Sequence, residues 1–214
     1  MTTLADALAD PRSSVRLRAV MAAGTHPDAQ DLDVLVAQCA VEPDFFVRDT
    51  LTWALTRHPA AEVVPRLLTE LDRSEPQARS QALHTLSKIG DRATWPAVRP
   101  LLEDPSDAVV RAAWRTAVAL VPDADRAALA RTLAVQLGQG DRETRLALTR
   151  ALAALGAETV HPVLQAAAGH RDAAVREHAA EVERVLADPD AASGLALERA
   201  RREVALGRTR SAKG

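Results

Sequence analysis

The sequence has a single cysteine, Cys39, and no asparagine or tyrosine among its 214 residues. One cysteine excludes an intramolecular disulfide and any thiolate metal cluster, which favours a reducing compartment. The N-terminal stretch "MTTLADALADP" lacks the basic and apolar segments of a signal peptide. No stretch approaches the roughly 18 apolar residues of a membrane span. We therefore expect a cytoplasmic protein.

The chain also lacks a large excess of either positive or negative charge. The chain has 27 Lys and Arg against 29 Asp and Glu, a net charge of −2 and a pI near 6.3. This balance argues against a protein that coats nucleic acid through a generally basic surface. Only two basic residues, Lys88 and Lys213, are lysines. So much arginine beside so much alanine indicates GC-rich codons, as in a bacterial genome, so arginine counts are weak evidence of function.

An arginine followed by small apolar residues recurs along the chain, as in "DAVVRAAWRTAVAL". Successive copies are separated by 32, 31, 32, 34 and 31 residues. A fixed period in this range predicts stacked helical units that each bury a face against the next. The six arginines are Arg16, Arg48, Arg79, Arg111, Arg145 and Arg176.

Each arginine begins a segment with apolar residues at helical spacing, such as Val47, Leu51 and Leu55. Acidic residues or proline precede these second helices, and glycine or proline is expected just past their ends. The end signals are Gly24, Pro59, Gly90, Pro122 and Gly156. Shorter first helices are predicted at 32–41, 63–71, 95–103, 126–137 and 161–168, three of them with a proline at one shared position. Strand signals are missing, so we predict an all-α fold.

The unit "VVPRLLTELDRSEPQARSQALHTLSKIGD" combines a proline in its first helix, an acidic turn, the arginine and a Gly-Asp ending. On these features residues 4–187 resemble the HEAT-repeat family, particularly the short bacterial repeats also found in phycobilisome lyase subunits. The resemblance implies a right-handed α-solenoid of about six helix pairs. We predict a repeat array at 1–187, followed by a C-terminal capping helix and basic tail at 188–214.

The resemblance also implies a structural role for the six arginines, in a buried polar ladder between units. The ladder acids would each lie four residues before an arginine. They are Asp44, Glu75, Asp107, Asp141 and Asp172, and the first unit has Arg12 at this position instead.

The second unit departs from the pattern, and we interpret the departure as a binding site. Phe45 and Phe46 are the only phenylalanines in the chain. The residue before each repeat arginine is Val15, Val47, Ala78, Val110, Thr144 or Val175. Six positions after it, at a place that we put off the core, the six units have Met21, Trp53, His84, Thr116, Arg150 and Glu181. Phe46, Asp49, Trp53 and Arg57 form one helical stripe. The predicted partner-binding residues on the concave surface are Phe45, Phe46, Asp49, Trp53, Arg57, His84, Lys88 and Arg115.

The sequence leaves the placement of some aromatic side chains open. Phe45, Phe46 and Trp53 could instead pack beneath the first unit or a neighbouring loop. Trp114 falls on the core stripe and is expected to pack there, whereas Trp95 begins a first helix and is ambiguous.

These patterns favour a non-enzymatic adaptor that binds a protein partner, such as a regulatory protein or a transcription factor, and needs no cofactor. The alternative is a DNA-binding array resembling alkylpurine DNA glycosylases, with Asp49 and Trp53 at a base and Arg115 and Arg150 at phosphates. The sequence carries no phosphate loop or nucleophile elbow. His178 and Glu181 share a helix face, but this pair is weak evidence for a metal. The resemblance to the phycobilisome lyase subunits is confined to the repeat itself, so it identifies no residue of this chain with lyase activity.

Overall fold

The computed structural model describes residues 3–188, so the predicted capping helix and basic tail lie almost wholly outside the described residues. The described part contains α-helices and short 3₁₀ helices and no strand. Helices come in antiparallel pairs, as in α-solenoids, which confirms the predicted fold class. The chain divides into two compact units, Met1–Leu129 and Ala130–Gly214.

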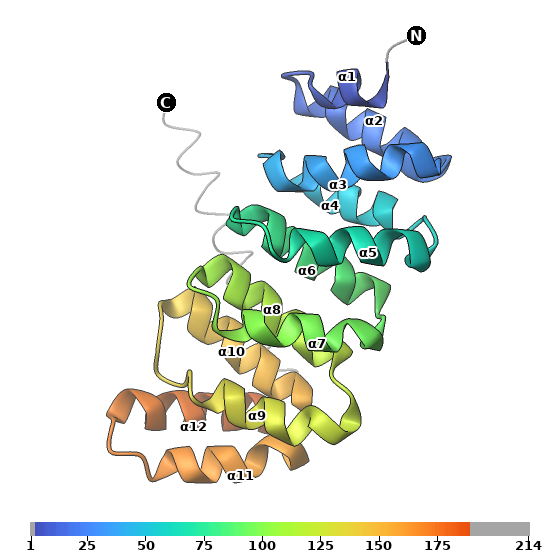
Figure 1. The fold of residues 1–214 in the computed structure, drawn as a ribbon. Helices are drawn as coiled ribbons and strands as arrows, with labels where there is room; N and C mark the ends of the chain where they lie inside the picture. Colours follow the sequence, from blue (N-terminus) through green and yellow to red (C-terminus); the bar gives the residue numbers. More distant parts are fainter. Residues whose placement is uncertain (1–2, 189–214) are drawn as a thin grey trace, which may run out of the picture. The chain divides into compact units, whose positions relative to one another are not determined.

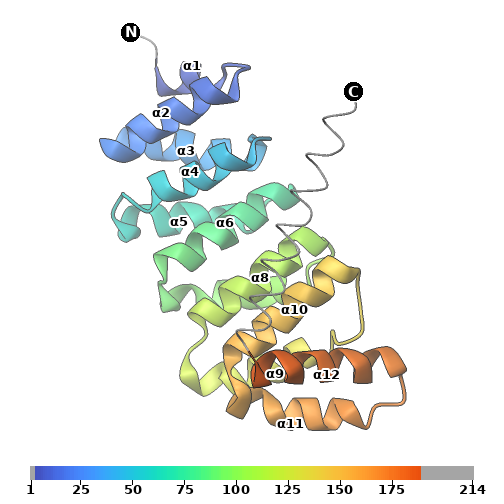
Figure 2. The ribbon, with the colours of Figure 1, turned by 180° about the vertical axis from the view of Figure 1, so that it is seen from behind.

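The first unit stacks helix pairs in two layers (Figures 1 and 2). The second helices form one layer, in which α4 contacts α2 and α6, and α6 contacts α8. The first helices form the other layer. The helices are α1 Leu4–Leu8, α2 Ser13–Thr25, α3 Leu32–Val41, α4 Phe45–Leu55, α5 Ala60–Glu70, α6 Pro76–Ile89, α7 Trp95–Val98 and α8 Asp107–Leu120. Helix α9, Arg126–Ala134, begins in this unit and ends in the next.

The second unit continues the pattern with α10 Arg142–Leu155, α11 Ala157–Ala168 and α12 Ala173–Ala187. Helix α12 packs against both α10 and α11. The two second helices, α10 and α12, lie side by side and are visible in Figure 2. Asp141 caps the start of α10, and Asp172 caps the start of α12.

The predicted helix ends are correct at Gly90 and wrong at Gly24. Gly90 follows α6 in the left-handed conformation, with φ of +76°, where glycine is favoured. Gly24 lies within α2, which continues to Thr25. The reason for glycine there is tertiary, because a side chain at this position would collide with Trp53 of the next pair.

One predicted first helix is broken in two. The segment 95–103 forms α7 and then a 3₁₀ helix, Arg99–Glu103. Pro100 has no N–H for an α-helical bond, and its ring would clash with the carbonyl four residues earlier, at Pro96. The α-helical pattern therefore ends before Pro100. Pro65 and Pro162 lie inside α5 and α11.

The core of the first unit consists mainly of Leu, Val and Ala. The predicted stripe of Val47, Leu51 and Leu55 is buried. Trp114 is also buried and donates its indole N–H to the carbonyl of Leu102 at 3.1 Å. Trp95 is buried as well, and its indole N–H meets Asp125 at 2.8 Å. Both tryptophans therefore serve packing.

Buried threonines join successive second helices, a feature that the sequence pattern did not reveal. The hydroxyl of Thr52 lies 3.3 Å from that of Thr85, which links α4 to α6. The hydroxyl of Thr116 donates to the carbonyl of Leu83 at 2.9 Å, which links α6 to α8. Thr116 was expected off the core, but it is buried because its short polar side chain can satisfy backbone carbonyls there.

Candidate functional site

The first turn of α4 carries two exposed phenylalanines. Phe45 is 65% exposed and Phe46 is 72% exposed. Their rings meet edge to face, with centroids 5.7 Å apart. Asp44 caps this turn by accepting hydrogen bonds from the amides of Phe46 and Val47. The cap fixes the turn, and both rings lie at the surface rather than beneath a neighbouring element.

Trp53 lies two turns further along α4 and is 41% exposed. One edge of its indole packs on Gly24 of α2, since a Cβ built on Gly24 would lie 2.3 Å from Cζ3 of Trp53. Trp53 is therefore held by the preceding pair on one side and open on the other. Arg57 is exposed, but α4 ends at Leu55 with Thr56 as its C-cap, so Arg57 lies just beyond the helical stripe.

Charged groups from two further helices lie near this stripe. Asp49 of α4 is exposed, and its carboxylate lies 4.0 Å from Nε2 of His84 on α6. Burial lowers the pKa of His84, and the positive charges of Arg115 on α8 and Lys88 lower it further. Asp49 opposes this shift. Lys88 and Arg115 are both exposed.

The structure thus places three exposed aromatic rings on one helix of the first unit and positive groups on the next two. We call Phe45, Phe46, Asp49, Trp53, Arg57, His84, Lys88 and Arg115 the aromatic surface. Its chemistry suits contact through apolar anchors with flanking charge, because aromatic side chains and arginine often dominate the energy of protein interfaces. Arg150 belongs to the second unit.

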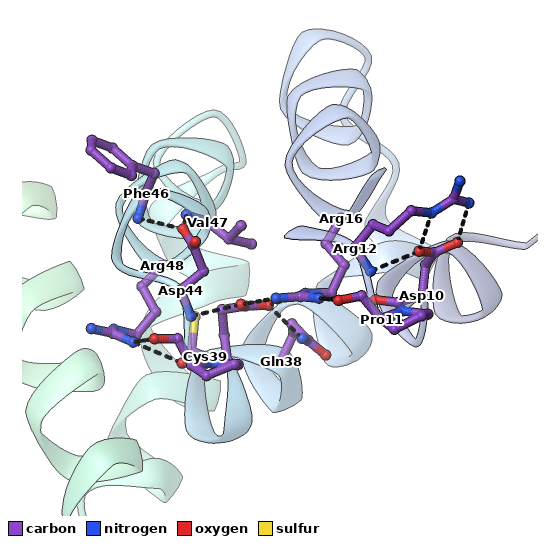
Figure 3. A network of polar contacts seen from close by, with 12 residues as sticks. Asp10, Pro11, Arg12, Arg16, Gln38, Cys39, Asp44, Phe46, Val47 and Arg48 are labelled. Atoms are coloured by element: carbon purple, nitrogen blue, oxygen red, sulfur yellow. Dashed lines mark hydrogen bonds and ion pairs between the residues drawn. The ribbon is translucent and has the colours of Figure 1, made fainter. Parts of the chain in front are cut away.

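Four of the six repeat arginines clamp the turn that precedes their own helix, and Figure 3 shows two of them, Arg16 and Arg48. Arg16 donates to the carbonyls of Asp10 and Pro11, and Arg48 to those of Glu42 and Pro43. The same two positions, five and six residues earlier, accept from Arg79 and from Arg176. The recurrence of the arginine therefore has a local cause, because each of these four guanidinium groups satisfies two carbonyls of the preceding turn.

Two of these arginines also form ion pairs with the helix pair that follows. Arg16 makes a bidentate pair with Glu42, with distances of 2.8 and 2.7 Å, and Arg79 makes one with Asp104, at 3.0 Å to each oxygen. Both acids end a first helix. The acids implied by the resemblance act differently: Asp44, Asp141 and Asp172 cap helices, and Glu75 pairs with Arg73.

Glu42 is fully buried and was not anticipated from the sequence. Burial by itself would raise the pKa of Glu42, but hydrogen bonds from Arg16, the Asp44 amide and Gln38 outweigh it and hold the pKa below its usual value. The available signal was spacing, since Glu42 follows Arg16 by 26 residues and Asp104 follows Arg79 by 25.

Two side chains of the described residues bear on metal and thiol chemistry, those of His178 and Cys39. Within residues 3–188 no three His, Cys, Asp or Glu side chains are grouped to hold a metal ion. Both nitrogens of His178 are engaged in internal hydrogen bonds. Cys39 is buried, and burial raises the pKa of its thiol to about 12. Across the described helices, none is long and apolar enough to cross a membrane.

Comparisons with known proteins address the repeat pattern. The family model for HEAT repeats matches residues 42–119 and 64–138. No curated protein matches the chain. Similar solved structures include two engineered proteins, at 19% and 16% identity, each covering 84% of this chain, with 93% and 95% of their own chains covered and TM-scores of 0.45 and 0.48.

A designed armadillo repeat protein is also similar, at 14% identity, with 86% of this chain and 98% of that chain covered and a TM-score of 0.42. The matched segment 42–138 begins after α3 and includes α4, which carries the aromatic rings, and the pairs α5–α6 and α7–α8 that follow it. Residues 42–138 of this chain are therefore recognised as HEAT repeats.

Proposed function

We propose that this protein is a non-enzymatic adaptor of the bacterial cytoplasm that binds a protein partner through the aromatic surface. The observation that carries the proposal is the exposure of Phe45, Phe46 and Trp53 on one helix. Large apolar side chains gathered at the surface cost free energy in water and commonly mark an interaction site. Single exposed residues elsewhere need no such explanation.

The geometry supports an anchored interface. Trp53 is fixed against Gly24, so its exposed face is already ordered and little side-chain entropy is lost on binding. The edge-to-face pair of Phe45 and Phe46 restricts both rings in the same way. Lys88 and Arg115 on the neighbouring helices add charge that can set the orientation of a partner.

Affinity capture from a bacterial lysate tests the proposal, with wild-type protein and the variants Phe46→Ala and Trp53→Ala side by side. Val135→Ala is the matched control, because Val135 is an exposed apolar residue of the second unit. We expect one discrete protein with wild type and the control, and its loss with both aromatic variants. Equal capture by all four proteins would contradict the proposal.

Nuclease treatment of the same lysate tests the alternative of a DNA-acting array. The salt dependence of binding is a second test. The affinity of a complex dominated by phosphate contacts falls steeply as the salt concentration rises, whereas the affinity of an interface anchored by aromatic residues changes modestly. Recovery of nucleic acid that is lost with nuclease and with Asp49→Asn or Arg115→Gln would favour the DNA-acting array.

A further inference from the structure

Arg145 of α10 lacks the clamp that other repeat arginines make. In four of them the guanidinium donates to carbonyls five and six residues earlier, as Arg176 does to His170 and Arg171. Within residues 3–188 the guanidinium of Arg145 makes no hydrogen bond or ion pair, and the residue is exposed. The clamp that explains these four arginines therefore does not explain Arg145.

The preceding turn accounts for the difference. Arg145 follows Arg111 by 34 residues, whereas the other intervals are 31 or 32. The longer turn contains Gly138 and Gly140, both at positive φ, +80° and +76°. These glycines give the turn a different backbone path from that of the other repeats, so the carbonyls of the turn do not meet the guanidinium of Arg145.

Arg145 instead lines a hollow of about 630 Å³ between α10 and α12. The α10 wall presents Arg142, Arg145 and Leu146, and the α12 wall presents Glu177 and Glu181. A hollow of this size is within the usual range for ligand sites. No ion pair joins the two walls within the described residues, so the charges of both face the open space.

His178 forms a fixed floor. Its Nδ1 accepts from the amide of Gly138 at 3.1 Å, so Nε2 carries the proton, near the Thr149 hydroxyl at 3.0 Å and the Arg145 carbonyl at 3.1 Å. Burial lowers the pKa of His178, so the ring is neutral near pH 7. The floor therefore adds shape and no charge, and the two walls determine the chemistry of the ligand.

The α10 wall is positive, whereas the α12 wall is negative at Glu177 and Glu181 and positive only at its end, at Arg184. An anion such as phosphate would meet the glutamates of α12, and a cation would meet the arginines of α10. A ligand with both charges, separated across the groove, satisfies both walls. The charged positions extend over about one turn of α10 and further along α12, where Arg184 is the last of them. Leu146 of α10 adds an exposed apolar contact. This linear arrangement suits an elongated ligand.

We infer that the hollow between α10 and α12 binds a peptide segment of mixed charge, with a carboxylate at Arg142 and Arg145 and a basic side chain toward Glu177 and Glu181. Guanidinium groups hold carboxylates through paired hydrogen bonds, which gives this end of the site its selectivity. The inference uses only residues of the second unit and is independent of the aromatic surface.

The test uses the full chain and three short synthetic peptides with blocked ends. The first peptide carries Glu on one helical face, Lys on the opposite face and Leu between them. In the second every Lys is replaced by Glu, and in the third every Glu is replaced by Lys. Fluorescence anisotropy measures binding, and the NMR signal of the His178 ring reports whether the peptide lies in the hollow.

We expect the mixed-charge peptide to bind most tightly and to shift the His178 signal. Arg145→Gln and Glu181→Gln should each weaken it roughly tenfold, as for the loss of one charge-assisted hydrogen bond. Arg171→Gln is the matched control, since Arg171 is an exposed arginine outside the hollow, and it should leave binding unchanged. The inference is overturned if the all-Glu peptide or inorganic phosphate binds equally well, if no peptide binds, or if Arg145→Gln has no effect.

Discussion

The indole ring of Trp53 occupies the space that a side chain at Gly24 would fill. A Cβ on Gly24 would lie 2.3 Å from Cζ3 of Trp53, 2.8 Å from its Cε3, and 2.9 Å from Cα of Ala54. Gly24 is thus selected by the next helix pair rather than by its own helix. This contact also orders the tryptophan that we propose as an anchor for a partner.

Gly24→Ala should destabilise the first unit. In an isolated helix this change is stabilising, because alanine has the higher helix propensity. Here the added methyl group would force Trp53 and α4 to move, and overpacking of this kind costs about 1–3 kcal/mol. Urea unfolding of both proteins measures the difference. The same change in a Trp53→Ala background should cost less, and an equal cost in both backgrounds would show that the indole is not the obstacle.

Removal of the Glu42 carboxylate should be more damaging than removal of an exposed acid. Glu42→Ala leaves the guanidinium of Arg16 buried without its partner, which costs about 3–5 kcal/mol. Asp33→Ala is the control, because Asp33 pairs with Arg66 at the surface, where such pairs contribute about 0–1 kcal/mol. Similar unfolding free energies for the two variants would contradict a stabilising role for the buried pair.

Glu42 should also make stability depend on pH in acid. Its folded pKa lies below the usual value of 4.5, so its contribution is complete above 4.5 and is lost as the pH falls through the folded pKa. Urea unfolding of wild type and Glu42→Gln between neutral pH and about pH 3 gives the difference. The wild type should lose more stability than the variant below pH 4.5. Parallel curves would count against the lowered pKa.

The periodic features of the fold were predictable, and the features specific to single positions were not. The spacing of Arg48, Val47 and Leu51 predicts a helix and its buried face, because helical periodicity is local. The reason for Gly24 lies 29 residues away in Trp53, and the partner of Arg16 lies 26 residues away in Glu42. Such pairings depend on how successive pairs stack, which no local pattern encodes. The aromatic residues of the second repeat, Phe45, Phe46 and Trp53, were identifiable by their rarity, whereas their exposure required the structure.

His178 should oppose folding at mildly acidic pH. Burial lowers its folded pKa below 6.5, the usual value in an unfolded chain. Above 6.5 the ring is neutral in both states. As the pH falls below 6.5 the unfolded state takes up the proton first, so stability decreases until the folded pKa is reached.

An NMR titration of the His178 ring in the folded protein measures its pKa directly. His178→Gln should flatten the dependence of unfolding free energy on pH below 6.5. The pH dependence of His84→Gln is measured for comparison, because burial and two positive neighbours also lower the pKa of His84. A folded His178 that titrates at or above 6.5 would contradict the buried neutral ring.

Two glycines in similar backbone conformations should respond differently to alanine. Gly90 has φ of +76° and Gly138 has φ of +80°, so either substitution incurs the left-handed penalty, about 1 kcal/mol. A Cβ on Gly90 would meet nothing within 4 Å, whereas one on Gly138 would lie 2.9 Å from the backbone nitrogen of Val175. Backbone cannot rotate away as a side chain can, so Gly138→Ala must also displace the start of α12.

Gly138→Ala should therefore cost about 1–3 kcal/mol more than Gly90→Ala in urea unfolding. It should also disturb the hydrogen bond from the Gly138 amide to His178, which amide hydrogen exchange at residue 138 would detect as lost protection. Equal costs for the two substitutions would mean that α12 yields readily at Val175. In that case the floor of the hollow would be adjustable, and Arg145 and Glu181 would not be held at fixed positions across it.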